Sequence, residues 1–374
     1  MRNRSIIILL GITLILACKK NTNGPKTTEN KKDRELILRY YADSIIIPAY
    51  DTFKTEFDLL KSSAENFAAN PTESSLAALR SSWTKAYIRW QTVELFDFGP
   101  GEKYTLRNFY NIYPADTTGI KNNISNTSAN LEVPASYPQQ GFPALDYLIN
   151  GVGQDDASIV AYYTDLSNGN KRTAYIRRIT DRMSTLLASV MNEWNGSFKE
   201  TFVSKTGLDL NSSTSLMVNG LVLHYERYIR SGKIGIPSGA MLNGTPAPDK
   251  VEAFYRKDIS LALAKSAHKA YVDFFNGRSF ISGNQGSSLK TYLDALDARD
   301  NTSGKLLSQL INEQFVLVES KLDLLQPNFH QQIISNNDPM KNAFNEMQAA
   351  VRMLKVDMTS AMSITITYTD NDGD

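Results

Sequence analysis

Apolar residues recur at spacings of three and four along most of the chain, which is the period of an amphipathic α-helix. Three stretches show this most clearly, at residues 76–93, 307–325 and 340–358. Further helices are predicted over residues 34–66, 156–194, 213–229 and 250–275. The strict alternation of apolar and polar residues that indicates a β-strand is nearly absent. We therefore predict an all-α fold with few or no strands, in which these stripes, including the methionine-rich third one, face a core.

Two long polar or turn-rich stretches separate the predicted helices. Residues 114–140 are dense in Asn, Thr, Ser and Pro, and residues 231–249 contain four glycines and three prolines. Loops of this length in a compact protein are usually functional or disordered. We predict two helical bundles packed into one compact body, an N-terminal one at residues 34–200 and a C-terminal one at residues 201–374, with both loops near the seam between them.

The N-terminus has the layout of a bacterial lipoprotein signal. Arg2 and Arg4 precede an apolar run from Ile6 to Ala17, which is too short to cross a membrane, and Cys18 follows. We predict a signal peptide at residues 1–17, lipidation of Cys18 and a flexible tether at residues 18–33. The predicted location is the cell envelope, lipid-anchored in the outer membrane and facing the periplasm. The alternative is a plain secreted protein with a chance cysteine.

Charge and cysteine content exclude several kinds of function. Removal of residues 1–17 takes away two of the 40 basic residues and none of the 39 acidic ones, which leaves a net side-chain charge of about −1. No basic patch indicates a nucleic-acid partner. Because Cys18 is the only cysteine, the chain has no internal disulfide, and any metal would be bound by oxygen or imidazole.

The three histidines, His224, His268 and His330, form no metal motif. None has a second histidine one helical turn away, as a zinc motif on a helix requires. His224 and Glu226 are two residues apart and would point in opposite directions on a helix. We interpret His224 as a core or seam histidine with a hydrogen-bonded ring, and a ligand role as the alternative. No nucleophilic serine motif or phosphate-binding loop is present.

The segment WTKAYIRWQTVELFDFGPGE, residues 83–102, holds the most suggestive carboxylate. Tyr87, Gln91 and Glu94 are expected on one face of a helix that ends before Gly99-Pro100. A carboxylate screened by aromatic rings has to be paired, hydrogen-bonded or protonated. Two readings of Glu94 stay open at this point: an ion pair with Arg89 or another local cation, and a site role. Asp97 would add a second carboxylate, and hard cations prefer oxygen ligands.

Several segments together resemble one family, the imelysin-like proteins. They are ELFDFGP at 94–100, NIYPAD at 111–116, GFPALDYLI at 141–149, KIGIP at 233–237 and the ending VDMTSAMSITITYTDNDGD. The resemblance implies two helical bundles in a secreted or lipid-anchored bacterial protein associated with iron uptake. It also implies metallopeptidase activity and a G-x-H-x-x-E motif at a site between the bundles.

This sequence departs from the family motif at its histidine. Gly141 matches the glycine and Asp146 stands at the acid position, but Pro143 stands where the histidine belongs. Proline has no imidazole and no backbone N–H, so it cannot replace a ligand or a base. By the resemblance, the ligand-binding candidates are Glu94, Gly141, Asp146 and His224, and no catalytic residue is predicted.

Three hypotheses about function follow. The first is a non-enzymatic envelope lipoprotein associated with iron or haem acquisition, which docks an outer-membrane transporter or another envelope protein. The second is a metallopeptidase, which the missing histidine disfavours. The third is a structural or interaction module with a vestigial site. The cofactor is unknown, with iron or another divalent cation as the candidate. The acidic C-terminus lacks a closing glutamate for calcium and is predicted to be a solvated tail.

Overall fold

The computed structural model describes residues 27–369, and Cys18 and the predicted signal peptide lie outside them. Within this range the structure has helices and no strand, only two isolated bridges, which confirms the all-α prediction. The elements of the N-terminal half are α1 (Thr27–Tyr40), η1 (Tyr41–Ile46), α2 (Ile47–Ala69), α3 (Glu73–Trp90), α4 (Pro100–Lys103), α5 (Leu106–Tyr110), α6 (Thr117–Ser125), η2 (Pro134–Gln139), α7 (Gly141–Asp146), η3 (Tyr147–Gly151), α8 (Asp156–Thr164), α9 (Gly169–Glu193) and η4 (Trp194–Phe198). Those of the C-terminal half are α10 (Lys199–Ser204), α11 (Ser213–Leu223), η5 (His224–Gly235), η6 (Pro248–Lys250), α12 (Ser260–Phe275), α13 (Leu289–Ala295), α14 (Leu307–Leu322), α15 (Phe329–Ser335), α16 (Asp338–Arg352), η7 (Met353–Met358) and α17 (Thr359–Ala361).

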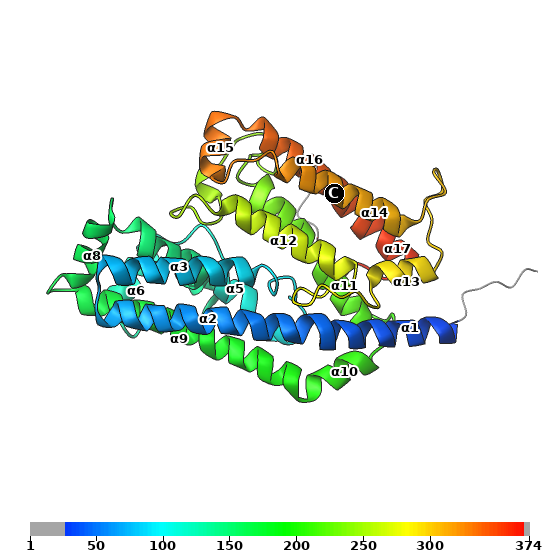
Figure 1. Cartoon of the computed structure of the whole chain (residues 1–374), viewed down its shortest axis with the longest axis horizontal. Coiled ribbons are helices and arrows are strands. Elements are labelled where there is room, and N and C mark those ends of the chain that lie inside the picture. Colours follow the sequence, from blue (N-terminus) through cyan, green and yellow to red (C-terminus); the bar gives the residue numbers. More distant parts are fainter. Residues whose placement is uncertain (1–26, 370–374) are drawn as a thin grey trace, which may run out of the picture.

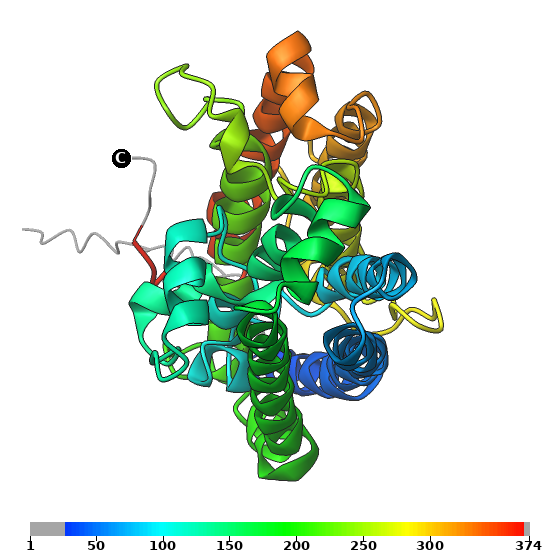
Figure 2. The ribbon, with the colours of Figure 1, turned by 90° about the vertical axis from the view of Figure 1, so that its left-hand side faces the viewer.

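The helices form two packed groups (Figure 1). In the first, α2 lies between α3 and α9, and α1, η1 and α2 run on as one long rod. In the second, α14 packs against α12 and α16, and α16 packs against η5. The groups meet where α12 lies on α3, and the view from the end shows them stacked one above the other (Figure 2). The predicted boundary near residue 200 remains a prediction.

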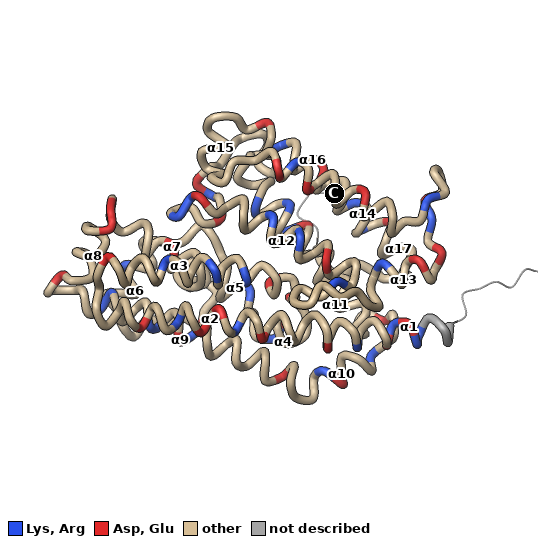
Figure 3. The backbone as a smooth tube through the Cα atoms, in the orientation of Figure 1, with Lys and Arg blue, Asp and Glu red and all other residues tan. Residues whose placement is uncertain are grey.

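The apolar stripes of the sequence form the core. Every member of the first two stripes is buried: Leu76, Leu79, Trp83, Tyr87, Trp90 and Val93 in the first, and Leu307, Ile311, Phe315, Val318, Leu322 and Leu325 in the second. In the third stripe, Phe344 is partly buried against the core, and the other members are buried: Met340, Met347, Val351, Leu354 and Met358. Basic and acidic residues are interspersed along the helices of both groups (Figure 3).

Several helix boundaries differ from the predicted ones. The helix predicted at residues 156–194 is two helices, because the chain turns at residues 165–168. The stretch at 231–249, predicted as a loop, is helical up to Gly235, where η5 ends. The helix predicted from residue 250 begins only at Ser260, because the chain before it turns through left-handed residues at Ala253 (φ 57°) and Lys257 (φ 67°).

Both ends of the described chain are more ordered than predicted. α1 begins at Thr27, so the last part of the predicted tether is helical. At the other end, Ile364 is buried, and the side chain of Asn219 binds the backbone of Thr365 and Thr367. Residues 364–369 therefore pack against α11, and the acidic end of the predicted tail, residues 370–374, lies outside the described residues. Among residues 27–369, no helix is both long enough and apolar enough to span a membrane.

Candidate functional site

Glu94 lies at the seam between the two helix groups, in a turn that follows α3. The Glu94 N–H donates to the carbonyl of Trp90, the last residue of α3, at 2.9 Å. α3 itself ends at Trp90, earlier than the predicted stop at Gly99. The apolar stripe of α3 buries this end of the helix, and Glu94 is only 2% exposed.

Two residues of the N-terminal half contact one oxygen of this carboxylate. Asn111 donates from Nδ2 to Glu94 Oε1 at 2.8 Å, and Arg107 Nε lies 3.6 Å from the same oxygen. Tyr87 donates to the amide oxygen of Asn111 at 2.6 Å, which fixes the orientation of that amide. The Arg107 guanidinium also lies over the ring of Tyr228, 3.2 Å from its centroid.

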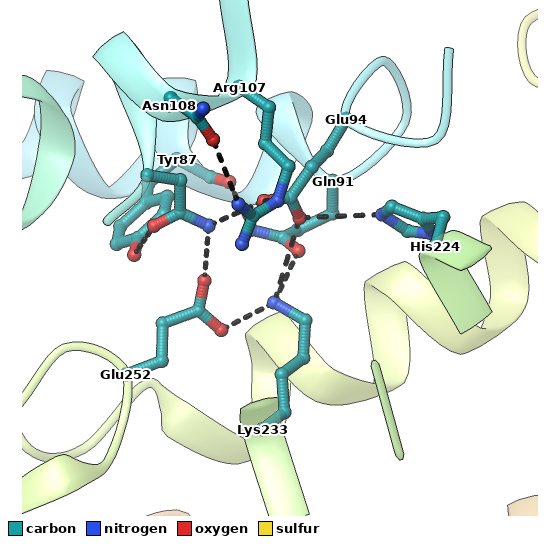
Figure 4. A network of polar contacts seen from close by, with 9 residues as sticks. Tyr87, Gln91, Glu94, Arg107, Asn108, His224, Lys233 and Glu252 are labelled. Carbon is teal, nitrogen blue, oxygen red and sulfur yellow. Dashed lines mark hydrogen bonds and ion pairs between the residues drawn. The ribbon is translucent and has the colours of Figure 1, made fainter. Parts of the chain in front are cut away.

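Two residues of the C-terminal half join the cluster, Lys233 on η5 and Glu252 in the loop before α12. Lys233 Nζ donates to Gln91 Oε1 at 2.8 Å and to Glu252 Oε2 at 2.5 Å, and lies 3.9 Å from Glu94 Oε2. Asn111 Nδ2 donates also to Glu252 Oε1, at 2.9 Å. These contacts join the two helix groups through buried polar atoms (Figure 4).

His224 reaches the same cluster from the first turn of η5. Its Nε2 lies 3.7 Å from Glu94 Oε2, too far for a hydrogen bond, and neither ring nitrogen has a hydrogen-bond partner in residues 27–369. The sequence-based expectation of a hydrogen-bonded ring is therefore wrong, although the ring is fully buried at the seam. Burial lowers the pKa of His224, and the nearby Glu94 only partly opposes this effect. We expect a neutral imidazole at neutral pH.

The charges in this cluster balance each other. Burial alone would raise the pKa of Glu94, but the Lys233 ammonium, with the Arg107 guanidinium, lowers it below its usual value. Glu94 and Glu252 supply two negative charges, and Lys233 and Arg107 supply two positive ones. Ion pairs at such depth are stable only with close partners of opposite sign.

Of the two open readings of Glu94, the ion pair is present, but its cations are Arg107 and Lys233 and not Arg89. Arg89 lines a separate cleft of about 360 Å³ between α3 and α12, together with Lys85 and Lys269. The second carboxylate in the cluster around Glu94 is Glu252 and not the predicted Asp97. Burial raises the pKa of Asp97 to about 6.

Asp146 stands at the acid position of the family motif. It forms a second buried polar contact between the two halves of the chain, apart from the cluster around Glu94. Its carboxylate accepts the backbone N–H groups of Tyr255 and Arg256, both at 2.9 Å, and the Asn150 amide at 2.9 Å. It is buried on α7, as is Pro143. Its hydrogen-bond partners differ from those of Glu94, so the two carboxylates bind different stretches of chain.

Gly141 is required by the backbone at the start of α7. Its φ is +77°, and a Cβ atom there would lie 2.3 Å from the carbonyl oxygen of Tyr110. Its place in the structure is set by conformation and close approach rather than by a side chain that could bind a ligand.

The residues of the seam do not fit a metal ion. Within residues 27–369, no three His, Cys, Asp or Glu side chains converge as a metal-binding group. The oxygens that could bind a cation, on Gln91, Glu94 and Glu252, surround the ammonium of Lys233 instead. Pro143 adds no ligand.

The sequence indicated part of this cluster and missed the rest. Arg107 and Glu252 lie in no motif that we singled out. Asn111 and Lys233 are the first residues of NIYPAD and KIGIP, two segments that carry the family resemblance. A polar first residue in such a segment was the signal that could have identified them as candidates for the site.

We expect the carboxyl group of Asp146 to make stability depend on pH. Burial raises its pKa from 3.8 to about 7, although the hydrogen bonds from Tyr255, Asn150 and Arg256 act against this. Between these values the native state keeps a proton that the unfolded chain has lost. The free energy of unfolding should therefore fall as the pH rises through this window, by at most about 1.4 kcal/mol per pH unit, and level off above it.

Urea unfolding at a series of pH values measures this effect. The Asp146→Asn variant, which cannot ionise here, should lack this part of the slope, while Asp97 titrates equally in both proteins. Parallel pH profiles for the two proteins would contradict the expectation.

Comparison with known proteins agrees with the all-α fold. The family model described as Imelysin matches residues 46–358, and the chain therefore belongs to the imelysin family. It is 24% identical over 229 residues to iron-regulated protein A of Synechococcus elongatus, a match that covers 59% of this chain and 58% of that relative.

Two solved structures share the fold. An imelysin-like protein from Psychrobacter arcticum 273-4 superposes with a TM-score of 0.68 at 17% identity, and the match covers 90% of this chain and 98% of that one. A protein described as an iron-regulated protein A precursor, from Parabacteroides distasonis ATCC 8503, gives a TM-score of 0.71 at 18% identity, with 88% and 95% covered. At these identities the likeness shows the fold alone.

Proposed function

We propose that this protein is a non-catalytic lipoprotein of the cell envelope that acts alongside iron or haem acquisition by binding a partner, such as an outer-membrane transporter. One observation carries the non-catalytic part: Pro143 replaces the motif histidine, and the motif acid Asp146 binds backbone N–H groups of the chain itself. A metallopeptidase needs a metal-activated water and a base free to act on it. The name of the Synechococcus relative supports the link to iron.

Two measurements test the function. Incubation with denatured insulin chain, with and without a chelator, should show no chelator-sensitive cleavage, and such cleavage would refute the non-catalytic proposal.

The amount of the protein in its native host should rise when iron is withheld. An amount that does not respond to iron would refute the link to iron acquisition. Calorimetry with haem then separates a haem carrier, which binds it, from a protein that acts only through its partner.

The anchor belongs to the same proposal. Cys18, at the end of an apolar run, would carry the lipid, and the chain that follows would join the anchor to α1. Labelling with a radioactive fatty acid should mark the wild-type protein and not the Cys18→Ser variant. Equal labelling of the two proteins would rule this anchor out.

A further inference from the structure

The cleft between α3 and α12 lies where the two helix groups meet, apart from the cluster around Glu94 (Figure 1). Its volume is about 360 Å³. Small-molecule sites are often found at such interfaces, in hollows of roughly 300–1,000 Å³. Part of the lining is apolar, because Ile88 and Phe280 lie there, partly buried against the core. The Phe280 ring faces the ring of Phe96 at 6.4 Å between centroids, which fixes this wall.

The α3 wall of the cleft carries two basic side chains without a partner. Lys85 and Arg89 are one helical turn apart and both line the cleft. In the described part of the chain neither side chain has an ion pair or a hydrogen bond, although Arg89 is partly buried. On the facing wall, Asp273 is bound by Lys269 and lies 3.8 Å from Arg278, so its charge is already balanced.

One other carboxylate lines the cleft, and it does not pair with these cations. Glu56 of α2 forms no ion pair with Lys85 or Arg89 in the described part of the chain. The lining therefore carries three positive charges, on Lys85, Arg89 and Lys269, against the two negative charges of Glu56 and Asp273. The excess is positive and lies on the α3 side.

A larger hollow elsewhere shows the opposite arrangement. It measures about 530 Å³ and lies beside α14 and η7. There Arg299 and Arg352 lie 2.8 and 3.8 Å from the carboxylates of Asp297 and Asp357. Its basic residues are thus paired within the protein, whereas those on the α3 wall of the cleft remain available to an anion.

The chemistry of the cleft matches an organic anion with two carboxylates. A guanidinium binds a carboxylate through two parallel N–H···O bonds, and an ammonium one turn away can bind a second carboxylate. Inorganic phosphate has no apolar part and would leave Ile88 and Phe280 without a ligand contact. A carbon skeleton between two carboxylates uses both the charged and the apolar wall.

We propose that the cleft between α3 and α12 is a binding site for a small organic dicarboxylate. Arg89 and Lys85 bind its carboxylates, and Ile88 and Phe280 contact its carbon skeleton. This inference goes beyond the proposed function and does not rest on it. That function fails on chelator-sensitive cleavage or on an absent iron response, and neither result decides whether the cleft binds a dicarboxylate.

Isothermal titration calorimetry on the purified protein tests the proposal. The probes are isophthalate and glutarate, which carry two carboxylates on a benzene ring and on a carbon chain, and benzoate, which carries one. Inorganic phosphate and a tetraglutamate peptide represent the other classes of anion.

Four variants locate the binding. Arg89→Gln and Lys85→Gln each remove one cation of the cleft. Ser266→Phe, on the α12 wall, fills the cleft and leaves all its charges. Arg299→Gln makes the same change of charge at the larger hollow and is the matched control. Circular dichroism confirms that each variant is folded.

We expect isophthalate to bind the wild-type protein at one molecule per chain with a Kd below about 1 mM, and to bind more tightly than glutarate or benzoate. Arg89→Gln should weaken this binding at least about tenfold, because the charge-assisted hydrogen bonds are lost. Lys85→Gln should weaken it less, and Ser266→Phe should abolish it. Arg299→Gln should bind as the wild-type protein does.

Three results would overturn the proposal. In the first, neither dicarboxylate binds the wild-type protein with a Kd below about 1 mM. In the second, phosphate or tetraglutamate binds more tightly than both dicarboxylates, which would assign the cations to another class of anion. In the third, Ser266→Phe binds as well as the wild-type protein, or Arg299→Gln loses as much affinity as Arg89→Gln, which would show attraction by surface charge alone.

Discussion

Replacing Glu94 by alanine will lower the free energy of unfolding by roughly 3–5 kcal/mol, the range for breaking a buried ion pair from one side. The variant leaves Arg107 without a carboxylate at 8% exposure and takes one of two negative charges from Lys233. It also removes the acceptor of one Asn111 hydrogen bond. Urea unfolding followed by circular dichroism measures the loss.

The control for this prediction is a glutamate whose ion pair is exposed. Glu313 binds Lys305 at the surface, and Glu313→Ala should change stability by less than about 1 kcal/mol. Adding Arg107→Met to Glu94→Ala should recover part of the loss, since the stranded charge is then gone. Similar losses for Glu94→Ala and Glu313→Ala would show that the seam network contributes little.

The stability that Glu94 contributes should also have a definite pH dependence. Its pKa is held below the usual 4.5, against the effect of burial, chiefly by Lys233. The contribution is therefore complete above about pH 4.5, and it decreases as the pH falls further. This slope has the opposite sign to the one expected from Asp146, so variants at the two positions can be told apart by pH alone.

The fold could be predicted from the sequence because amphipathic helices have a local pattern of apolar residues. The stripes at residues 76–93 and 307–325 repeat every three to four residues, and burying those positions requires helices. Their exact ends were less accessible. α12 begins late, at Ser260, because tertiary contacts hold the preceding loop: Asp146 binds the Tyr255 and Arg256 N–H groups, and Lys233 binds Glu252.

The candidate site could be predicted from the sequence only in part. The pattern around Tyr87 and Trp90 showed that Glu94 would be screened from water and would need a partner. It could not identify the partner, because Lys233 lies 142 residues from Gln91, which it binds, and Glu252 lies 141 residues from Asn111. Nearby Arg89 was the natural candidate in sequence, yet its place is in the cleft between α3 and α12. Contacts at such separation depend on how the helix groups dock.

At residues 141–146 the sequence is enough to predict the local structure but not the tertiary contacts of its side chains. Proline is tolerated in the first turn of a helix, and Pro143 lies there in α7, which begins at Gly141. The sequence did not show that Asp146, in the last turn of this short helix, binds the backbone of the loop before α12. That loop also carries Glu252 into the seam. Asp146 thus fixes the backbone of the loop whose Glu252 binds Lys233 and Asn111.

Replacing Gly141 by alanine will destabilise the protein by about 2–5 kcal/mol, through backbone strain and overlap together. The residue has φ +77°, and its new Cβ atom would meet the carbonyl oxygens of Tyr110 at 2.3 Å and Phe109 at 2.8 Å. These are backbone atoms at the end of α5, so no side-chain rotation relieves the overlap, and α5 or α7 has to shift.

Gly304 is the matched control, because it has a similar φ of +70° but a Cβ atom there has no neighbour within 4 Å. Gly304→Ala should therefore cost only the backbone strain, about 1–2 kcal/mol. A shift of α7 would also move Asp146 away from the Tyr255 and Arg256 N–H groups. We therefore expect Gly141→Ala to alter the Asp146-dependent slope between pH 4 and pH 7, as well as to lower the melting temperature. Equal melting temperatures for the two glycine variants would show that the start of α7 tolerates a side chain.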